Sequence, residues 1–263
     1  MKQSTMPSPG NDILGDIVAT KRRDLPAILS QRAERPAATR ISFREAIRHQ
    51  PCGAIIAELK RRSPSRGILC EEYDPAQIAA EYREGGAAAL SVLTDGPYFG
   101  GDIEHLALAK RASGLPALCK DFFIDPRQVF WAAEHGADAA LLIARILDDG
   151  ALAEMLEAVA SAGLDALVET HTRAEIERAC KAGAQIIGVN CRDLKSFGVA
   201  LDLSVELGSA IPASVTAVAE SGVRSAGDIE RLRGAGYQAF LIGEALMTAP
   251  NRVRALETLR GGC

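Results

Sequence analysis

The sequence predicts an α/β fold, a single (β/α)8 TIM barrel with an N-terminal helical extension. Eight short runs rich in Val, Ile, Leu and Ala recur along the chain, and longer segments with helical periodicity separate them. The runs are apolar almost throughout, as parallel strands are when helices cover the sheet. Eight such units in about 210 residues fit the length of a (β/α)8 barrel.

The expected strands follow one another at regular intervals. They occupy residues 54–60, 88–94, 116–122, 138–144, 165–170, 185–190, 215–221 and 238–244. The helical segments between them are residues 74–86, 102–114, 125–137, 148–163, 172–184 and 225–236. Most of these segments begin with Asp, Thr or Ser, which cap helix N-termini, and most end near Gly, which is common just past a helix C-terminus.

A doubly wound sheet is the main alternative fold. Such a sheet usually carries a Gly-rich turn after its first strand, whereas here the first run continues into Glu-Leu-Lys-Arg. The sequence therefore favours the barrel. Residues 1–50 form the extension, with helices expected in residues 12–31 and 42–49, and residues 51–263 form the barrel. No linker or low-complexity segment separates the two parts, so we expect one domain.

Composition and charge exclude several classes of protein. With a net charge of −4, the chain lacks the basic surface of a nucleic-acid-binding protein. It has no run of about 18 apolar residues and no signal-peptide core, so we expect a cytoplasmic protein. The six cysteines stand singly, which predicts reduced thiols. The histidines show no metal-ligand spacing and are interpreted as solvent or helix residues: His49, His105, His135 and His171.

Polar residues end several of the expected strands. In a barrel, alternate side chains face the axis, and catalytic groups come from the C-terminal ends of the strands. A buried unpaired charge is costly, so such groups persist when they pair with one another or with a ligand. Six residues at these ends predict an active site: Glu58, Lys60, Lys120, Glu169, Asn190 and Glu220.

Two further features point to an anionic substrate. The loops after the last two strands contain Ser221, Gly222, Gly243 and Glu244, whose backbone N–H groups can bind a phosphate. The basic stretch ELKRRSPSRG, residues 58–67, follows the first strand at the same rim. Read alone, it could be a nucleic-acid patch or a phosphorylated arm. Its place between a strand and a helix favours an anion site.

Several segments resemble one known family, indole-3-glycerol phosphate synthase of tryptophan biosynthesis. The segments that carry the resemblance are ILGDIVATKRRDL, AELKRRSPSRG, ALSVLTDGPYFGG, CKDFFIDPRQV, ADAALLIARIL, LVETHTRAEIERA, IIGVNCRDLKSF, AESGV and FLIGEALM. The matching segments extend in register from about residue 11 to about residue 260.

The resemblance implies a cofactor-free lyase without a metal. It would convert 1-(2-carboxyphenylamino)-1-deoxyribulose 5-phosphate into indole-3-glycerol phosphate, CO2 and water. Lys120 would be the general acid and Glu169 the general base. Lys60, held by Glu58, would meet the charged end of the substrate, and Asn190 and Glu220 would orient these groups. The other implied contacts are Ser221, Gly222, Gly243 and Glu244 for the phosphate, and Ser63, Phe99, Phe122, Leu141, Ile143 and Arg192 for the rest of the substrate.

The sequence also indicates the kind of ligand to expect and leaves two alternative functions to consider. A phosphorylated small molecule is the expected ligand, without nucleic acid or membrane, and association with other tryptophan-pathway enzymes is left open. Phosphoribosylanthranilate isomerase is another phosphate-binding barrel, but its reaction is expected to use a cysteine and an aspartate at strand ends. A catalytically inactive barrel that serves as a subunit of a complex would have no need of Lys60, Lys120 and Glu169.

Overall fold

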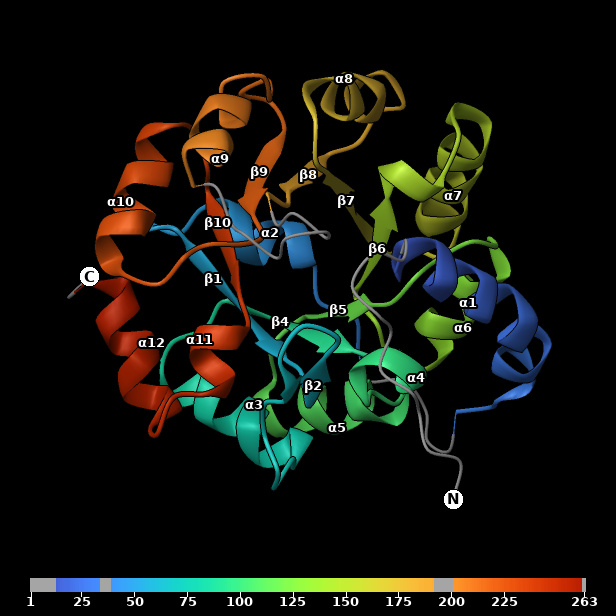
Figure 1. Cartoon of the computed structure of the whole chain (residues 1–263), viewed down its shortest axis with the longest axis horizontal. Helices are drawn as coiled ribbons and strands as arrows, with labels where there is room; N and C mark the ends of the chain where they lie inside the picture. The colour runs from blue at the N-terminus through green and yellow to red at the C-terminus, as the bar shows by residue number, and fades with distance from the viewer. Residues whose placement is uncertain (1–12, 34–38, 192–200, 262–263) are drawn as a thin grey trace.

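Eight parallel strands form a closed barrel, and helices surround it (Figure 1). The computed structural model describes residues 13–33, 39–191 and 201–261. Around the barrel the strands follow chain order, and β1 closes the ring between β4 and β10. The predicted fold class is confirmed. The strands are β1 (Ala54–Leu59), β4 (Ala89–Leu93), β5 (Ala117–Lys120), β6 (Ala139–Ile143), β7 (Asp165–Thr170), β8 (Ile186–Val189), β9 (Thr216–Ala219) and β10 (Ala239–Ile242).

The outer helices lie where helical periodicity predicted them. Six fall within the expected segments: α3 (Pro75–Glu84), α5 (Glu104–Ser113), α6 (Arg127–Glu134), α7 (Asp149–Ser161), α8 (Arg173–Lys181) and α10 (Ala226–Gly234). Helices α9 (Leu201–Gly208) and α12 (Arg252–Arg260) complete the ring. Asp74, Asp148, Thr172 and Ser225 begin four of these helices, and each side chain accepts a backbone N–H of the first turn.

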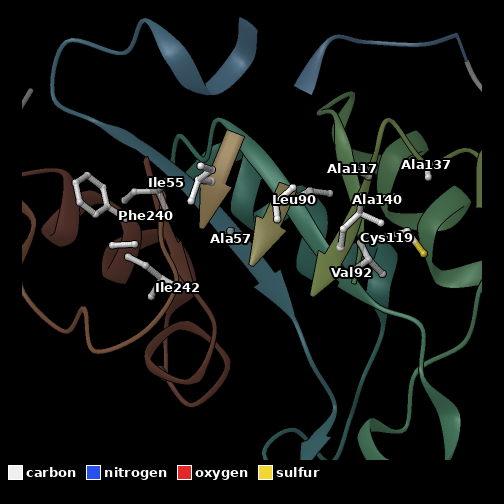
Figure 2. Packing of buried hydrophobic residues seen from close by; sticks show 14 of the residues in the cluster. Ile55, Ala57, Leu90, Val92, Ala117, Cys119, Ala137, Ala140, Phe240 and Ile242 are labelled. Carbon is white, nitrogen blue, oxygen red and sulfur yellow. The ribbon is translucent and has the colours of Figure 1, made fainter. Parts of the chain in front are cut away.

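Two apolar layers hold the barrel together. Inward-facing residues of the strands fill its interior, and Phe43 and Ile47 of α2 (Phe43–Arg48) close the N-terminal end. Outward-facing residues pack against the helices, as Figure 2 shows for Ile55, Val92 and Phe240. Because the N-terminal end is filled, the C-terminal end is the face on which a ligand site can open.

The N-terminal extension holds the two expected helices. Helix α1 (Ile13–Ser30) lies beside α6, with Ile17 and Lys21 buried (Figure 1). Helix α2 lies in the second predicted segment, 42–49. No helix in the described part of the chain is long and apolar enough to cross a membrane.

Some local features were not predicted. The basic stretch after β1 forms a small hairpin of β2 (Arg62–Ser63) and β3 (Gly67–Ile68), and short helices follow β4 and β6, namely α4 (Gly96–Phe99) and η1 (Ala144–Ile146).

The expectation of six reduced thiols is wrong for Cys52, which is disulfide-bonded, whereas Cys70, Cys119, Cys180 and Cys191 are free. Sequence spacing does not reveal such a bridge, because disulfide bonding depends on the distance between cysteines in the fold.

Candidate active site

A cavity of about 410 Å³ opens at the C-terminal end of the barrel. Every site residue that the sequence predicted lines it, except Arg192, which lies outside the described residues. Groups far apart in the chain therefore converge on one cavity. The predicted residues that line it are Glu58, Lys60, Ser63, Phe99, Lys120, Phe122, Leu141, Ile143, Glu169, Asn190, Glu220, Ser221, Gly222, Gly243 and Glu244.

Strand pleating explains this convergence. In β1, Ile56 packs inside the barrel, so Glu58 and Lys60 follow on the same face. In β5, Leu118 packs inside and Lys120 follows it. The same relation holds for Leu167 and Glu169 in β7, and for Val218 and Glu220 after β9.

Lys120 stands between two buried carboxylates. Its Nζ lies 2.9 Å from Glu169 Oε2 and 3.3 Å from Glu220 Oε2, and it donates a hydrogen bond to each. Lys60 donates to Glu58 in the same cavity. Charge-assisted bonds of this kind are the stronger ones in proteins and hold the side chains in defined positions.

Burial and neighbouring charges set the ionisation of this cluster. Burial disfavours the charge on Lys120, but the charges of Glu169, Glu220 and Glu58 outweigh it and raise the pKa of Lys120. Burial also opposes ionisation of Glu169, yet Lys120 and then His171 lower the pKa of Glu169. Burial raises the pKa of Glu220. The charge of Lys120 opposes this shift, and the charge of the adjacent Glu169 adds to it. The cluster therefore holds a charged lysine beside an ionised Glu169, while Glu220 keeps its proton more tightly than an ordinary glutamate.

Two glycines make room for these carboxylates. A Cβ added at Gly188 in β8 would collide with the carboxylate of Glu220, and one added at Gly243 would collide with that of Glu58. Gly188 was not among the predicted site residues. A glycine inside a strand, as in the run IIGV, is the sequence signal that could have identified it.

The rim near the last two strands combines small residues with an ion pair. Gly222 has a φ of 87°, which favours glycine, and the short helix α11 (Glu244–Met247) follows Gly243 as expected. The hydroxyl of Ser221 is buried and has no hydrogen-bond partner in the described part of the chain. Glu244 pairs with Arg66 of the hairpin loop at 3.0 Å.

Apolar side chains form the opposite wall of the cavity. The rings of Phe99 and Phe122 lie 6.1 Å apart between centroids, and Leu141 and Ile143 come from β6. Helix α1 completes this wall with side chains that sequence reasoning did not assign to the site, Ile13, Leu14 and Ile17.

Lys21 fixes α1 to the barrel. Its Nζ lies 3.0 Å from Asp95 Oδ2 and 2.6 Å from Asp121 Oδ1, and all three side chains are buried. Asp95 and Asp121 stand in the loops after β4 and β5, so the ion pairs connect the extension to the rim of the cavity. The sequence contained a signal for this role, since Lys21 comes four residues after Ile17 on the apolar face of the helix.

The interpretation of His171 as a solvent or helix residue is wrong. Its side chain is only 6% exposed and lines the cavity, with Nε2 3.5 Å from Glu169 Oε1 and Nδ1 3.5 Å from Glu175 Oε2. Glu169 and His171 are two residues apart and therefore face the same side, which is the signal that could have placed His171 in the site. Within the described ranges, no group of three or more His, Cys, Asp or Glu side chains could hold a metal ion.

Together the fold and the site define a (β/α)8-barrel enzyme with a lysine and glutamates at its strand ends. Known barrels share this fold. A thiamine phosphate pyrophosphorylase from Pyrococcus furiosus has a TM-score of 0.59 at 18% identity, covering 83% of this chain and 96% of its own. A 3-hexulose-6-phosphate synthase from Salmonella typhimurium has a TM-score of 0.63 at 12% identity, covering 79% of this chain and 96% of its own.

Sequence comparison is more specific. Residues 14–259 match the family model described as indole-3-glycerol phosphate synthase. The enzyme of that name from Pelodictyon phaeoclathratiforme is 50% identical over 196 residues, which are 74% of this chain and 77% of that protein. The one from Leptothrix cholodnii is 44% identical over 260 residues, covering 95% and 99%. The chain belongs to the indole-3-glycerol phosphate synthase family.

Proposed function

We propose that this enzyme converts 1-(2-carboxyphenylamino)-1-deoxyribulose 5-phosphate into indole-3-glycerol phosphate, CO2 and water. The observation that carries the proposal is the position of Lys120 between Glu169 and Glu220 in a partly apolar cavity, in a chain of this family. Ring closure needs a proton donor at the ketone oxygen, and dehydration needs a base. The cluster supplies both in the required ionisation states, because Lys120 is charged and Glu169 is ionised.

The proposed steps use these groups in turn. The aromatic carbon that bears the carboxylate attacks the ketone carbon while Lys120 gives a proton to the ketone oxygen. The carboxylate then leaves as CO2, and its electron pair restores the aromatic ring. Finally Glu169 removes a proton from the methylene carbon beside the carbon that bears the hydroxyl group, and the C=C bond of the new ring forms while that hydroxyl group takes a proton from Lys60 and leaves as water. A positioned acid or base of this kind contributes about 10²–10⁴-fold to the rate.

The other residues that line the cavity are suited to the carboxylate, the phosphate and the aromatic ring of this substrate. Lys60, held by Glu58, is suited to the substrate carboxylate, with Asn190 and Glu220 orienting the reacting groups. Ser63 and Arg192 are proposed as further contacts to polar groups. The phosphate is proposed to bind backbone N–H groups of Ser221, Gly222, Gly243 and Glu244, and the anthranilate ring to lie against Phe99, Phe122, Leu141 and Ile143.

The isomerase alternative receives less support. Cys119, which stands next to Lys120, is fully buried in the apolar layer between barrel and helices and does not line the cavity. Burial raises the pKa of this thiol, with the charge of Asp121 adding to the effect, so it is poorly suited to proton transfer.

Turnover of the carboxyphenylamino substrate tests the proposal. The protein would be incubated with it without added metal or cofactor, and indole fluorescence would be followed beside CO2 release in equal amounts. We expect both signals from the wild type, and both signals about 10²–10⁴-fold weaker from Glu169→Gln, the usual contribution of a positioned base. Absence of turnover by correctly folded wild type, or activity on phosphoribosylanthranilate instead, would overturn the proposal.

A further inference from the structure

A chain of ionisable side chains extends from the cavity through Glu169 to the surface. Glu169 faces Lys120 with Oε2 and His171 with Oε1. His171 in turn faces Glu175 of α8, and Glu175 Oε1 lies 3.4 Å from Arg145 Nε of η1. Exposure of the side chains rises outward, from 7% at Glu169 and 6% at His171 to 13% at Glu175 and 40% at Arg145.

The turn between β7 and α8 holds this arrangement in place. The backbone N–H of His171 donates to Glu175 Oε2 at 2.6 Å, while the hydroxyl of Thr172 accepts the N–H of Glu175. Glu175 is thereby fixed at the start of α8 with one oxygen near both the backbone and the ring of His171. The imidazole therefore stands between two carboxylates, and its two ring nitrogens face different ones.

We propose that His171, held by Glu175, is a positioning residue for the base Glu169. It fixes Oε1 of that carboxylate, so that Oε2 is presented toward Lys120 and the substrate. The inference rests on the proposed function, because it gives Glu169 the role of base. Catalytic contacts are often long before substrate binds, and a separation of 3.5 Å leaves room for the pair to tighten during the reaction.

The electrostatics of the cluster support the same role. Burial opposes ionisation of Glu169, and the charge of Lys120 followed by that of His171 lowers its pKa. Among the described residues, the charged and titratable groups that face this carboxylate are Lys120 from β5, Glu220 from the end of β9 and His171 after β7. Removing His171 takes away one of the groups that favour the ionised form of Glu169.

Kinetics of His171→Leu test the inference. We expect kcat to fall about 10²-fold, as for a slightly misplaced catalytic group, and KM to change little. The acid limb of the kcat profile should move to higher pH, because Glu169 becomes easier to protonate. His171→Gln keeps a donor and should recover part of kcat, and Glu175→Gln should move the acid limb in the same direction by less. His49→Leu and Glu177→Gln, both at exposed positions, are the matched controls and should behave as wild type.

A double-mutant cycle separates positioning from a loss of folding. If His171 acts through Glu169, His171→Leu should cost nothing further in a Glu169→Gln background. Additive losses, or an unmoved acid limb with normal circular dichroism, would overturn the inference. If His171→Leu does not fold, the Glu175→Gln profile decides in its place. An inactive wild type would reject the proposed function, whereas an active wild type with unaffected His171 and Glu175 variants would reject only this inference.

Discussion

Lys120 Nζ lies 2.9 Å from Glu169 Oε2, so the proposed acid and the proposed base of the reaction are in direct contact. Each keeps the other charged, because the carboxylate raises the pKa of the lysine and the ammonium lowers that of the glutamate, both against burial. Substitution of either residue therefore changes both.

Lys120→Met should lower kcat by about 10²–10⁴-fold, the usual contribution of a positioned acid. Lys120→Arg should not restore it, because the planar guanidinium cannot place a donor where Lys120 Nζ lies between the two carboxylates. Steady-state kinetics with circular dichroism check both variants, and Lys181→Met, at an exposed position on α8, is the control. A folded Lys120→Met enzyme that keeps more than about a tenth of its kcat would contradict the assignment and favour Lys60 as the acid.

Lys60→Met should raise KM as well as lower kcat. Lys60 lines the cavity beside Glu58, and a charge that contacts the substrate in its ground state contributes to both constants. The measurement is a saturation curve for Lys60→Met beside that for Lys120→Met. An effect confined to kcat would mean that Lys60 does not bind the substrate.

Gly222→Leu should raise KM strongly, and inorganic phosphate should compete with the substrate for the wild-type enzyme. A side chain at Gly222 meets both an unfavourable φ of 87° and the proposed phosphate position. Gly163→Leu is the matched control, because Gly163 has a φ of 67° and open space around it, away from the cavity. If both variants change KM alike, or phosphate does not compete, the phosphate site lies elsewhere.

The ionised Glu175 should stabilise the folded protein at neutral pH, and this stabilisation should be lost in acid. Burial opposes its ionisation, but the nearby ring of His171 and the hydrogen bond from its backbone N–H outweigh this and lower the pKa of Glu175 from 4.5 to about 2. Above pH 4.5 the unfolded chain is also ionised and the stabilisation is complete. As pH falls toward 2 the unfolded chain takes up the proton first, so the stabilisation is lost. The free energies of unfolding of wild type and Glu175→Gln, measured with urea, should therefore differ most at neutral pH and converge in acid. A difference that stays constant with pH would contradict this.

Much of the site was predictable because strands obey a strict period of two. Once Ile56 or Leu118 is assigned to the barrel interior, Glu58 or Lys120 must face the cavity, and the structure places them there. The hairpin after β1 was not predicted, since a loop of Arg, Ser and Pro has no periodicity. The role of His171 was missed for a similar reason. It follows the last strand residue, and its partner Glu175 is brought near only by the geometry of the turn.

The same limit applies to Lys21, whose partners Asp95 and Asp121 lie in loops far along the chain. Lys21→Met should leave these two carboxylates buried without their cation, and breaking a buried pair in this way costs about 3–5 kcal/mol of unfolding free energy. Because α1 also contributes Ile17 to the cavity wall, KM should rise at temperatures where the variant is still folded. Arg23→Met is the control in the same helix, since Arg23 is 70% exposed in its pair with Asp24 and should change the free energy of unfolding little. Urea unfolding and saturation kinetics measure both effects, and equal losses in the two variants would show that Lys21 does not fasten the helix.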